Sequence, residues 1–251
     1  MSERIISSLS GKIYHESDIR VLQFLGRGTS GRAFKLDEER VIKILNNSIP
    51  HRIKTLVTIK DLQLPNFYKL YDILYEGDLM LERYVGCISS YHKSEPVNIF
   101  EMPSSWIIDN FESLSESVII LGRNKIKIND LIPGNVIINR DGITVIDVDG
   151  YEKQDRTCVR INLDKLKTIF FFRLLKNNYN AYYSASEDFV PIGLILNDFF
   201  SEDTNIRKKD FVKILSKYPR FIDYVRERTE KQKNKYRGLL WMKIYYIHQT
   251  A

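Results

Sequence analysis

The sequence has little cysteine and no long apolar run. Only Cys87 and Cys158 are cysteines, too few for a disulfide framework and without the spacing of a metal site. Such sparse cysteine favours a reducing, intracellular environment, so we expect a cytoplasmic protein. No segment approaches the ~18 uninterrupted apolar residues that a membrane-spanning helix needs. The N-terminus also lacks the apolar core of a signal peptide. We therefore expect no membrane span.

Histidine is also scarce, and the charge is only mildly one-sided. The four histidines are scattered along the chain, so we expect no metal or catalytic role for them. The net charge of +6 and the isoelectric point of about 9.1 suit an anionic ligand without requiring nucleic acid, and we expect no nucleic-acid partner. The 251 residues are 43% hydrophobic and 12% aromatic, enough to bury the core of one large domain or two small lobes.

Glycine is sparse, yet 3 of the 12 glycines fall between residues 26 and 31, in the stretch FLGRGTSGRAFKL. The surrounding residues alternate like a strand, and glycine weakens a strand interior. A bare backbone turn lets N–H groups lie against phosphates, which is one explanation. A dinucleotide-binding turn would have to open a helix, whereas this turn is followed by a strand. A glycine-rich hairpin without a ligand is the alternative.

The first 85 residues read as a five-stranded antiparallel sheet with one helix. Apolar residues at roughly helical spacing predict the helix at 51–64. The last two strands form a hairpin that turns at Glu76-Gly77-Asp78. The predicted strands are 19–25, 32–36, 40–45, 68–77 and 78–85.

Beyond residue 86 the pattern becomes mainly helical. One hairpin interrupts it, with an Asp141-Gly142 turn, a strong short-range hairpin signal. The fold class is therefore α+β, and we divide one overall domain into a β-rich lobe at 1–85 and a shortened helical lobe at 86–251. The predicted helices are 104–122, 161–177, 187–200, 208–216 and 218–247.

Two further features carry chemistry. Lys43 lies in the apolar strand VIKIL, where a buried lysine needs an anionic partner such as a phosphate; an edge strand with the lysine in solvent is the alternative.

In NDLIPGNVIINRDGITVIDVDG, Asp130 precedes Asn135 by five residues, and Asp147 ends the hairpin. A carboxylate can orient the proton of an attacking hydroxyl, while an amide oxygen and a second carboxylate suit Mg²⁺. Any one of these aspartates alone would read as a turn residue.

Taken in order, these segments resemble the protein-kinase-like superfamily, as a small, divergent eukaryotic-like Ser/Thr protein kinase of bacterial or viral origin. LGRGTSGRAFKL resembles the glycine-rich loop, VIKIL the lysine strand and MLERYVG the hinge. NDLIPGN resembles the catalytic loop, and VIDVDG replaces Asp-Phe-Gly. The resemblance covers about residues 19–177 and implies a two-lobed kinase-like fold.

The resemblance implies ATP and Mg²⁺ as cofactors and transfer of the γ-phosphate to a hydroxyl. It assigns Asp130 to the attacking hydroxyl, Asn135 and Asp147 to Mg²⁺, and Lys43 to the α- and β-phosphates. Asp147 is preferred over Asp149 because it follows Val145-Ile146 at the end of the hairpin strand. The remaining implied nucleotide contacts are Gly26, Arg27, Gly28, Thr29, Ser30 and Gly31 over the phosphates, with Glu82 and Tyr84 near adenine.

Three departures bear on the site and its control. Residues 50–64 contain no glutamate to pair with Lys43, and Thr55 occupies the aligned position, so Lys43 would be held by phosphates alone or by Asp147. Asn129 replaces the arginine that would receive a phosphorylated activation loop. Only 16 residues separate Asp147 from Asp164, too few for a full activation segment.

The acceptor stays open at this stage. We expect a protein substrate, whereas the open catalytic loop also resembles small-molecule kinases of the aminoglycoside and choline kinase type. The missing helix glutamate would also fit a nucleotide-binding pseudokinase. The intact set of Lys43, Asp130, Asn135 and Asp147 favours an active enzyme.

Overall fold

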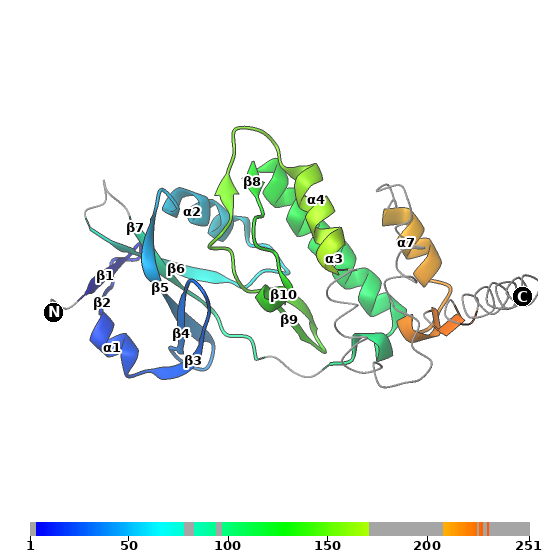
Figure 1. The fold of residues 1–251 in the computed structure, drawn as a ribbon, viewed down its shortest axis with the longest axis horizontal. Helices are drawn as coiled ribbons and strands as arrows, with labels where there is room; N and C mark the ends of the chain where they lie inside the picture. The colour runs from blue at the N-terminus through cyan, green and yellow to red at the C-terminus, as the bar shows by residue number, and fades with distance from the viewer. Residues whose placement is uncertain are drawn as a thin grey trace, which may run out of the picture. The chain divides into compact units, whose positions relative to one another are not determined.

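The computed structural model describes residues 4–77, 83–93, 97–170, 208–224, 226–227 and 230. The chain has the predicted α+β architecture (Figure 1). Its backbone forms two compact units: unit 1 comprises residues 1–96 and 113–166, and unit 2 comprises 97–112 and 167–251. The predicted lobe boundary between residues 85 and 86 falls within a strand, Arg83–Ser90, and the two-lobe division stays a prediction.

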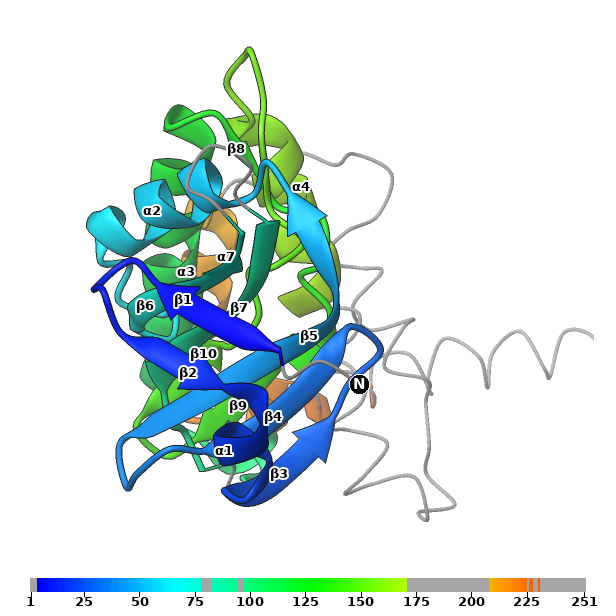
Figure 2. The same ribbon diagram turned by 90° about the vertical axis from the view of Figure 1, so that its left-hand side faces the viewer.

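Unit 1 is built on an antiparallel sheet of seven strands rather than the predicted five (Figure 2). The two additional strands precede residue 16, and the short helix α1, Glu16–Arg20, takes the start of the first predicted strand. The order is β2-β1-β6-β7-β5-β4-β3. The strands are β1 Ile5–Ser8, β2 Ile13–His15, β3 Gln23–Arg27, β4 Gly31–Lys35, β5 Arg40–Pro50, β6 Leu70–Glu76 and β7 Arg83–Ser90.

Strand β7 differs most clearly in position from the strand that the sequence predicted. The sequence predicted a strand that ends at residue 85, directly before Gly86, but β7 continues to Ser90. A side chain at Gly86 would place its Cβ 2.0 Å from the carbonyl oxygen of Lys43 on β5. This glycine therefore lies inside the strand because the neighbouring backbone approaches closely, whereas sequence reasoning treated it as an end.

One helix packs against the seven-stranded sheet, and the sheet has an apolar core. Helix α2, Ile53–Leu62, packs against β6 and begins two residues later than predicted. It ends where Gln63 adopts a left-handed conformation, with a φ of 46°. The sheet core consists of the buried residues Ile6, Ile19, Phe34, Ile42, Ile44, Leu74, Val85 and Ile88.

The rest of unit 1 is a run of short elements that follows helix α3, Ser104–Arg123. Helix α3 and the hairpin around Asp141-Gly142 confirm the sequence predictions. Helix α4 begins at Val159, two residues before its predicted start. The short elements are β8 Ile126–Lys127, η3 Pro133–Asn135, β9 Val136–Asn139, β10 Gly142–Val145, β11 Glu152–Lys153 and α4 Val159–Lys167.

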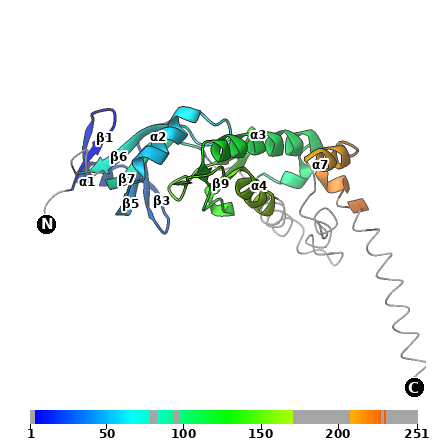
Figure 3. The same ribbon diagram turned by 90° about the horizontal axis from the view of Figure 1, so that it is seen from above.

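Unit 2 contains η2, Ile99–Glu101, the first half of α3 and α7, Lys208–Leu215 (Figure 3). The Ser104 amide donates to the carbonyl oxygen of Pro219 over 2.9 Å. Helix α7 confirms the prediction at 208–216, while the predicted helix at 187–200 and most of that at 218–247 lie outside the described residues. Among the helices that the structure describes, none has the length and apolarity required to cross a membrane.

Candidate functional site

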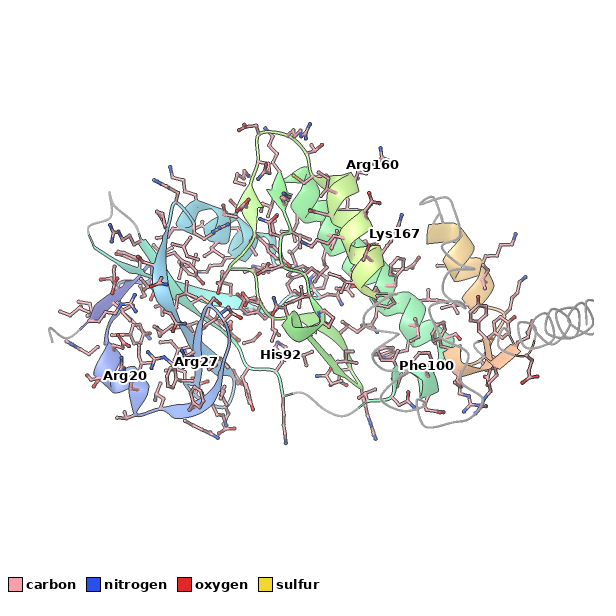
Figure 4. All side chains as sticks on the ribbon, viewed as in Figure 1. Arg20, Arg27, His92, Phe100, Arg160 and Lys167 are labelled. Carbon is pink, nitrogen blue, oxygen red and sulfur yellow. The ribbon has the colours of Figure 1, made fainter. Side chains whose placement is uncertain are left out.

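Unit 1 holds a cavity of about 490 Å³ that brings together several separate parts of the sequence. The glycine turn between β3 and β4 contributes Gly26–Gly28 and Gly31, and the end of β7 with the following residues contributes Ser89–His92. Lys43, Asn135 and Asp147 also line it. Figure 4 labels Arg27 and His92 on two of these segments. A volume of this size is typical of a small-molecule site.

The structure gives different reasons for the presence of glycine at the three positions of the turn. A side chain added at Gly26 or Gly28 would meet nothing within 4 Å, so these two positions leave open space beside the cavity. At Gly31, by contrast, a Cβ would lie 2.4 Å from the carbonyl oxygen of Ile44 on β5, so glycine is needed there for strand packing. The sequence reading gave all three the same role.

The tip of the turn is attached to β5 rather than directed into the cavity. The carbonyl oxygen of Ser30 accepts from the Asn46 amide over 2.9 Å, and that of Thr29 accepts from the Asn46 side chain over 3.4 Å. Neither Thr29 nor Ser30 is among the residues that line the cavity. These bonds hold the turn in place, so Thr29 and Ser30 shape the turn from outside the cavity.

Lys43 lies on an interior strand, which removes the alternative of a solvent-exposed edge. Strand β5 is paired with β4 on one side and β7 on the other, opposite Ala33 and Cys87. The Lys43 Nζ atom lies 2.6 Å from Asp147 Oδ2 and 2.5 Å from Asp149 Oδ2. Burial alone would lower the pKa of Lys43, but the charges of Asp149 and Asp147 outweigh it and raise the pKa.

The two aspartates that bind Lys43 differ in environment. Asp147 lines the cavity with 20% of its side chain exposed, whereas the Asp149 side chain is 6% exposed and does not line it. Burial raises the pKa of Asp149, although the Lys43 charge opposes this shift. The Asp149 amide donates to Asp147 Oδ1 over 3.1 Å, which orients the cavity-facing carboxylate. Asp147 is therefore the acid available to a ligand.

Asp130 lies close enough to both acids to be affected by their charges. Burial first, and then the charges of Asp147 and Asp149, raise its pKa to about 6. Its Oδ1 atom is buried and has no hydrogen-bond partner within the described part of the chain. The Asn135 side-chain nitrogen donates to the Asp130 carbonyl oxygen over 2.9 Å, which fixes the loop between them. A buried acceptor without a donor is a site where a hydroxyl could bind.

A lysine that sequence reasoning missed also contacts this loop. Lys165, on α4, donates to the carbonyl oxygen of Asn129, the residue before Asp130. Burial lowers the pKa of Lys165, and the charge of Asp130 opposes that shift. In the sequence, Lys165 is marked only by its position on the helix that follows Asp147. That position does not predict a contact with the loop that carries Asp130.

The side chain of Tyr84 does not face the cavity, whereas the expected contact of adenine with the backbone near Glu82 and Tyr84 stays a prediction. Tyr84 is fully buried inside β7, and its hydroxyl donates to Asp149 Oδ1 instead of facing the cavity. Glu82 lies outside the described residues. The segment that lines the cavity is Ser89–His92, at the other end of β7. The prediction near Glu82 and Tyr84 came from the resemblance of MLERYVG to a kinase hinge.

The donor atoms present fit a magnesium-bound polyphosphate. Within the described ranges, no three acidic, histidine or cysteine side chains form a metal cluster. Asp147 offers a carboxylate to the cavity, and Asn135 uses its amide nitrogen toward Asp130, which leaves the amide oxygen available. Mg²⁺ is commonly bound by one or two protein oxygens together with substrate phosphates and water.

Comparison with known proteins finds similarity among solved structures. No family model matches the chain, and no curated protein matches it. Among solved structures, the chain is similar to the Legionella pneumophila kinase Lpg2603 bound to IP6, with 15% sequence identity and a TM-score of 0.47. The likeness covers 82% of this chain and 83% of that protein.

Proposed function

We propose that the chain is an ATP- and Mg²⁺-dependent phosphotransferase that transfers the γ-phosphate of ATP to a hydroxyl group. The observation that supports this most directly is the shared cavity of the glycine turn, Lys43, Asn135 and Asp147. Asp130 lies in the electrostatic range of the same acids, with an unpartnered carboxylate oxygen. These groups come from four separate segments, so a single turn or charge cluster does not account for their meeting.

Each group has a defined task in this proposal. Gly26 and Gly28 leave room for a phosphate chain against the turn, and Lys43 binds its α- and β-oxygens. Asn135 and Asp147 would hold Mg²⁺, which when bound neutralises charge on the phosphates. Asp130 accepts a hydrogen bond from the attacking hydroxyl and orients it toward the γ-phosphate.

Adenine recognition belongs to the end of β7 in this proposal. Ser89–His92 line the cavity together with the glycine turn. The Ser90 hydroxyl and the His92 Nε2 atom are 2.8 Å apart, and the Tyr91 amide donates to the Glu39 carbonyl oxygen over 2.7 Å. These bonds give the segment a fixed backbone against which a base could bind.

The acceptor that we propose first is a serine or threonine hydroxyl of a protein. The second candidate is a small-molecule hydroxyl, and one observation favours it. Only residues 154–158 connect β11 to α4, a segment too short to form a large peptide platform. A nucleotide-binding pseudokinase is the third candidate, and the assembled set of Lys43, Asp130, Asn135 and Asp147 favours an active enzyme over it.

The test is incubation of the purified chain with γ-labelled ATP and Mg²⁺. Parallel reactions contain generic protein acceptors, aminoglycosides or choline, and Asp147→Ala serves as the control variant. We expect label transfer by the wild type and none by the control. ATP binding without transfer to any acceptor would favour the pseudokinase, and failure to bind Mg²⁺-ATP would contradict the proposed function.

A further inference from the structure

Asp149 is a buried carboxylate for which the proposed function has no task. We propose that Asp149 is the positioning residue for Lys43, holding its amine from the same segment that carries Asp147 rather than from helix α2. This inference rests on the proposed function, because it concerns how the lysine of that site is kept in place.

Both oxygens of Asp149 contact protein side chains, Oδ2 through an ion pair without a hydrogen bond and Oδ1 through a hydrogen bond. Oδ2 lies 2.5 Å from Lys43 Nζ, and Oδ1 accepts a hydrogen bond from the Tyr84 hydroxyl. Tyr84 is on β7, the strand paired directly with the β5 strand of Lys43. Asp149 is therefore held between a lysine and a tyrosine that neighbouring strands fix in space. A carboxylate so occupied, with 6% of its side chain exposed, is poorly placed to bind a metal ion in the cavity.

The two aspartates can then act at the same time. Lys43 contacts both, but only Asp147 faces the cavity. A cation on Asp147 would compete with Lys43 for that carboxylate and weaken their bond. The bond to Asp149 would remain, so the lysine would keep one anionic partner while it turns toward phosphate oxygens. Without that partner a buried ammonium group would be strongly disfavoured.

Helix α2 offers no comparable support. The residue aligned with the expected glutamate is Thr55, which is buried, and the first turn of α2 contains no acidic residue. Of the ion pairs that join described residues, those of Lys43 go to Asp147 and Asp149 alone. The position of Lys43 should therefore be insensitive to substitutions on α2, because its two partners lie in the segment after β10.

The experiment is a double-mutant cycle between Asp149 and Lys43, measured by titration with a fluorescent ATP analogue. The variants are Asp149→Asn, Lys43→Met and both together. If Asp149 acts through Lys43, each single variant lowers affinity at least about fivefold, and the double variant is no weaker than Lys43→Met within about twofold. Thermal melts supply a second readout. Lys43→Met leaves Asp149 unpaired, so adding Asp149→Asn should raise the melting temperature of that variant.

Two further variants separate positioning from a general structural role. Tyr84→Phe removes the hydroxyl that donates to Asp149 and should lower the affinity for the ATP analogue by about threefold. This effect should disappear when Lys43→Met is also present. Asp72→Asn is the matched control, because Asp72 is equally buried in this sheet but accepts from Ser10 and Ile73. It should leave nucleotide affinity within about twofold of the wild type, even where it lowers the melting temperature.

Magnesium dependence distinguishes Asp149 from a metal ligand. The Mg²⁺ concentration for half-maximal transfer should rise in Asp147→Asn and stay unchanged in Asp149→Asn. The inference is overturned if Asp149→Asn binds nucleotide like the wild type, if its effect multiplies with that of Lys43→Met, or if it shifts the Mg²⁺ requirement. If Asp149→Asn does not fold, the Tyr84→Phe cycle with Lys43→Met decides in its place. Failure of the wild type to bind nucleotide would instead overturn the proposed function.

Discussion

The two compact units bury different kinds of side chain. Unit 1 places the charged groups of Lys43, Asp130 and Asp149 near one another, although of these three only Lys43 lines the cavity. Burial shifts the pKa of each of them or opposes the shift that their neighbours cause. Among the described residues of unit 2, no charged side chain is fully buried. Its core is aromatic, and the Phe100 and Phe221 rings lie 5.1 Å apart. Buried charges destabilise a fold unless they are paired. We therefore infer that the charged residues of unit 1 are kept for a function, whereas the buried residues of unit 2 serve packing.

A buried carboxylate is not by itself a functional sign, as Asp72 in unit 1 demonstrates. Asp72 accepts from the Ser10 hydroxyl, the Ser10 amide and the Ile73 amide, which tie the β1–β2 turn to β6. Burial tends to raise its pKa, but these hydrogen bonds lower it overall. Among the described residues, the partners of the Asp149 carboxylate are the side chains of Lys43 and Tyr84, and no backbone amide donates to it. The Asp149 carboxylate therefore differs from that of Asp72 in being paired with a charged amine, that of Lys43.

The largest expected effect is that of Asp147→Ala in unit 1. It should lower the rate of transfer by about 10³-fold, because the cavity loses the Asp147 carboxylate that lines it. The fold should persist, since Lys43 keeps Asp149 as a partner. Single-turnover kinetics and a thermal melt measure both quantities. Wild-type transfer by this variant would contradict the assignment of the cavity.

In unit 2 the largest effect should be on stability. Phe221→Ala removes a fully buried ring that packs on Phe100 and Tyr224, and should destabilise the fold by about 3–5 kcal/mol. Phe221→Leu is the matched control and should lose much less, because it keeps most of the buried volume. Chemical denaturation measures both. A smaller loss for the alanine variant than for the leucine variant would contradict the packing role.

Asp130→Asn should separate activity from stability. It should lower turnover by about 10²-fold, because the amide cannot accept the hydroxyl proton. Because the pKa of folded Asp130 is raised to about 6 from 3.8, its ionised form is disfavoured by the fold. The variant should therefore melt at a higher temperature than the wild type above pH 6. This difference should shrink as the pH falls from 6 toward 4 and should be lost below 3.8, where wild-type Asp130 is protonated in both states.

The pH dependence of activity checks the same group. Wild-type transfer should decline as the pH falls through about 6, because Asp130 becomes protonated. The residual activity of Asp130→Asn should lack this decline. A variant with unchanged turnover, or one that loses ATP affinity, would make Asp130 a structural residue instead.

The smallest expected effect lies in the segment between β11 and α4. Thr157 is exposed there, beside Arg156, and is the acceptor that a phosphorylation switch would use. Asn129 offers no cation on the loop to couple such a phosphate to Asp130. Thr157→Ala and phosphatase treatment should each leave activity within about twofold. A tenfold loss in either would reveal a switch in this segment.

The sequence predicted most local elements, and its errors have specific causes. Helix α3 and the Asp141-Gly142 hairpin were found because periodicity and turn chemistry are local signals. Strands β1 and β2 were missed because three- and four-residue segments have too few residues for a pattern. Tyr84 was assigned to adenine because MLERYVG resembles a kinase hinge, and local sequence did not reveal that its side chain is buried against Asp149. The strand was ended before Gly86, although the close approach of Lys43 explains that glycine.

What the sequence alone determined is the order of chemical groups: a glycine turn, a lysine in an apolar strand, and Asp130, Asn135 and Asp147 around a hairpin. Each is visible within a few neighbouring residues, because spacing and alternation are properties of the local chain. The tertiary structure alone decided that Lys43 meets Asp149 as well as Asp147, and that Tyr84 holds Asp149. Tyr84 and Asp149 are 65 residues apart, and local periodicity carries no information about which distant side chains the packed strands bring into contact.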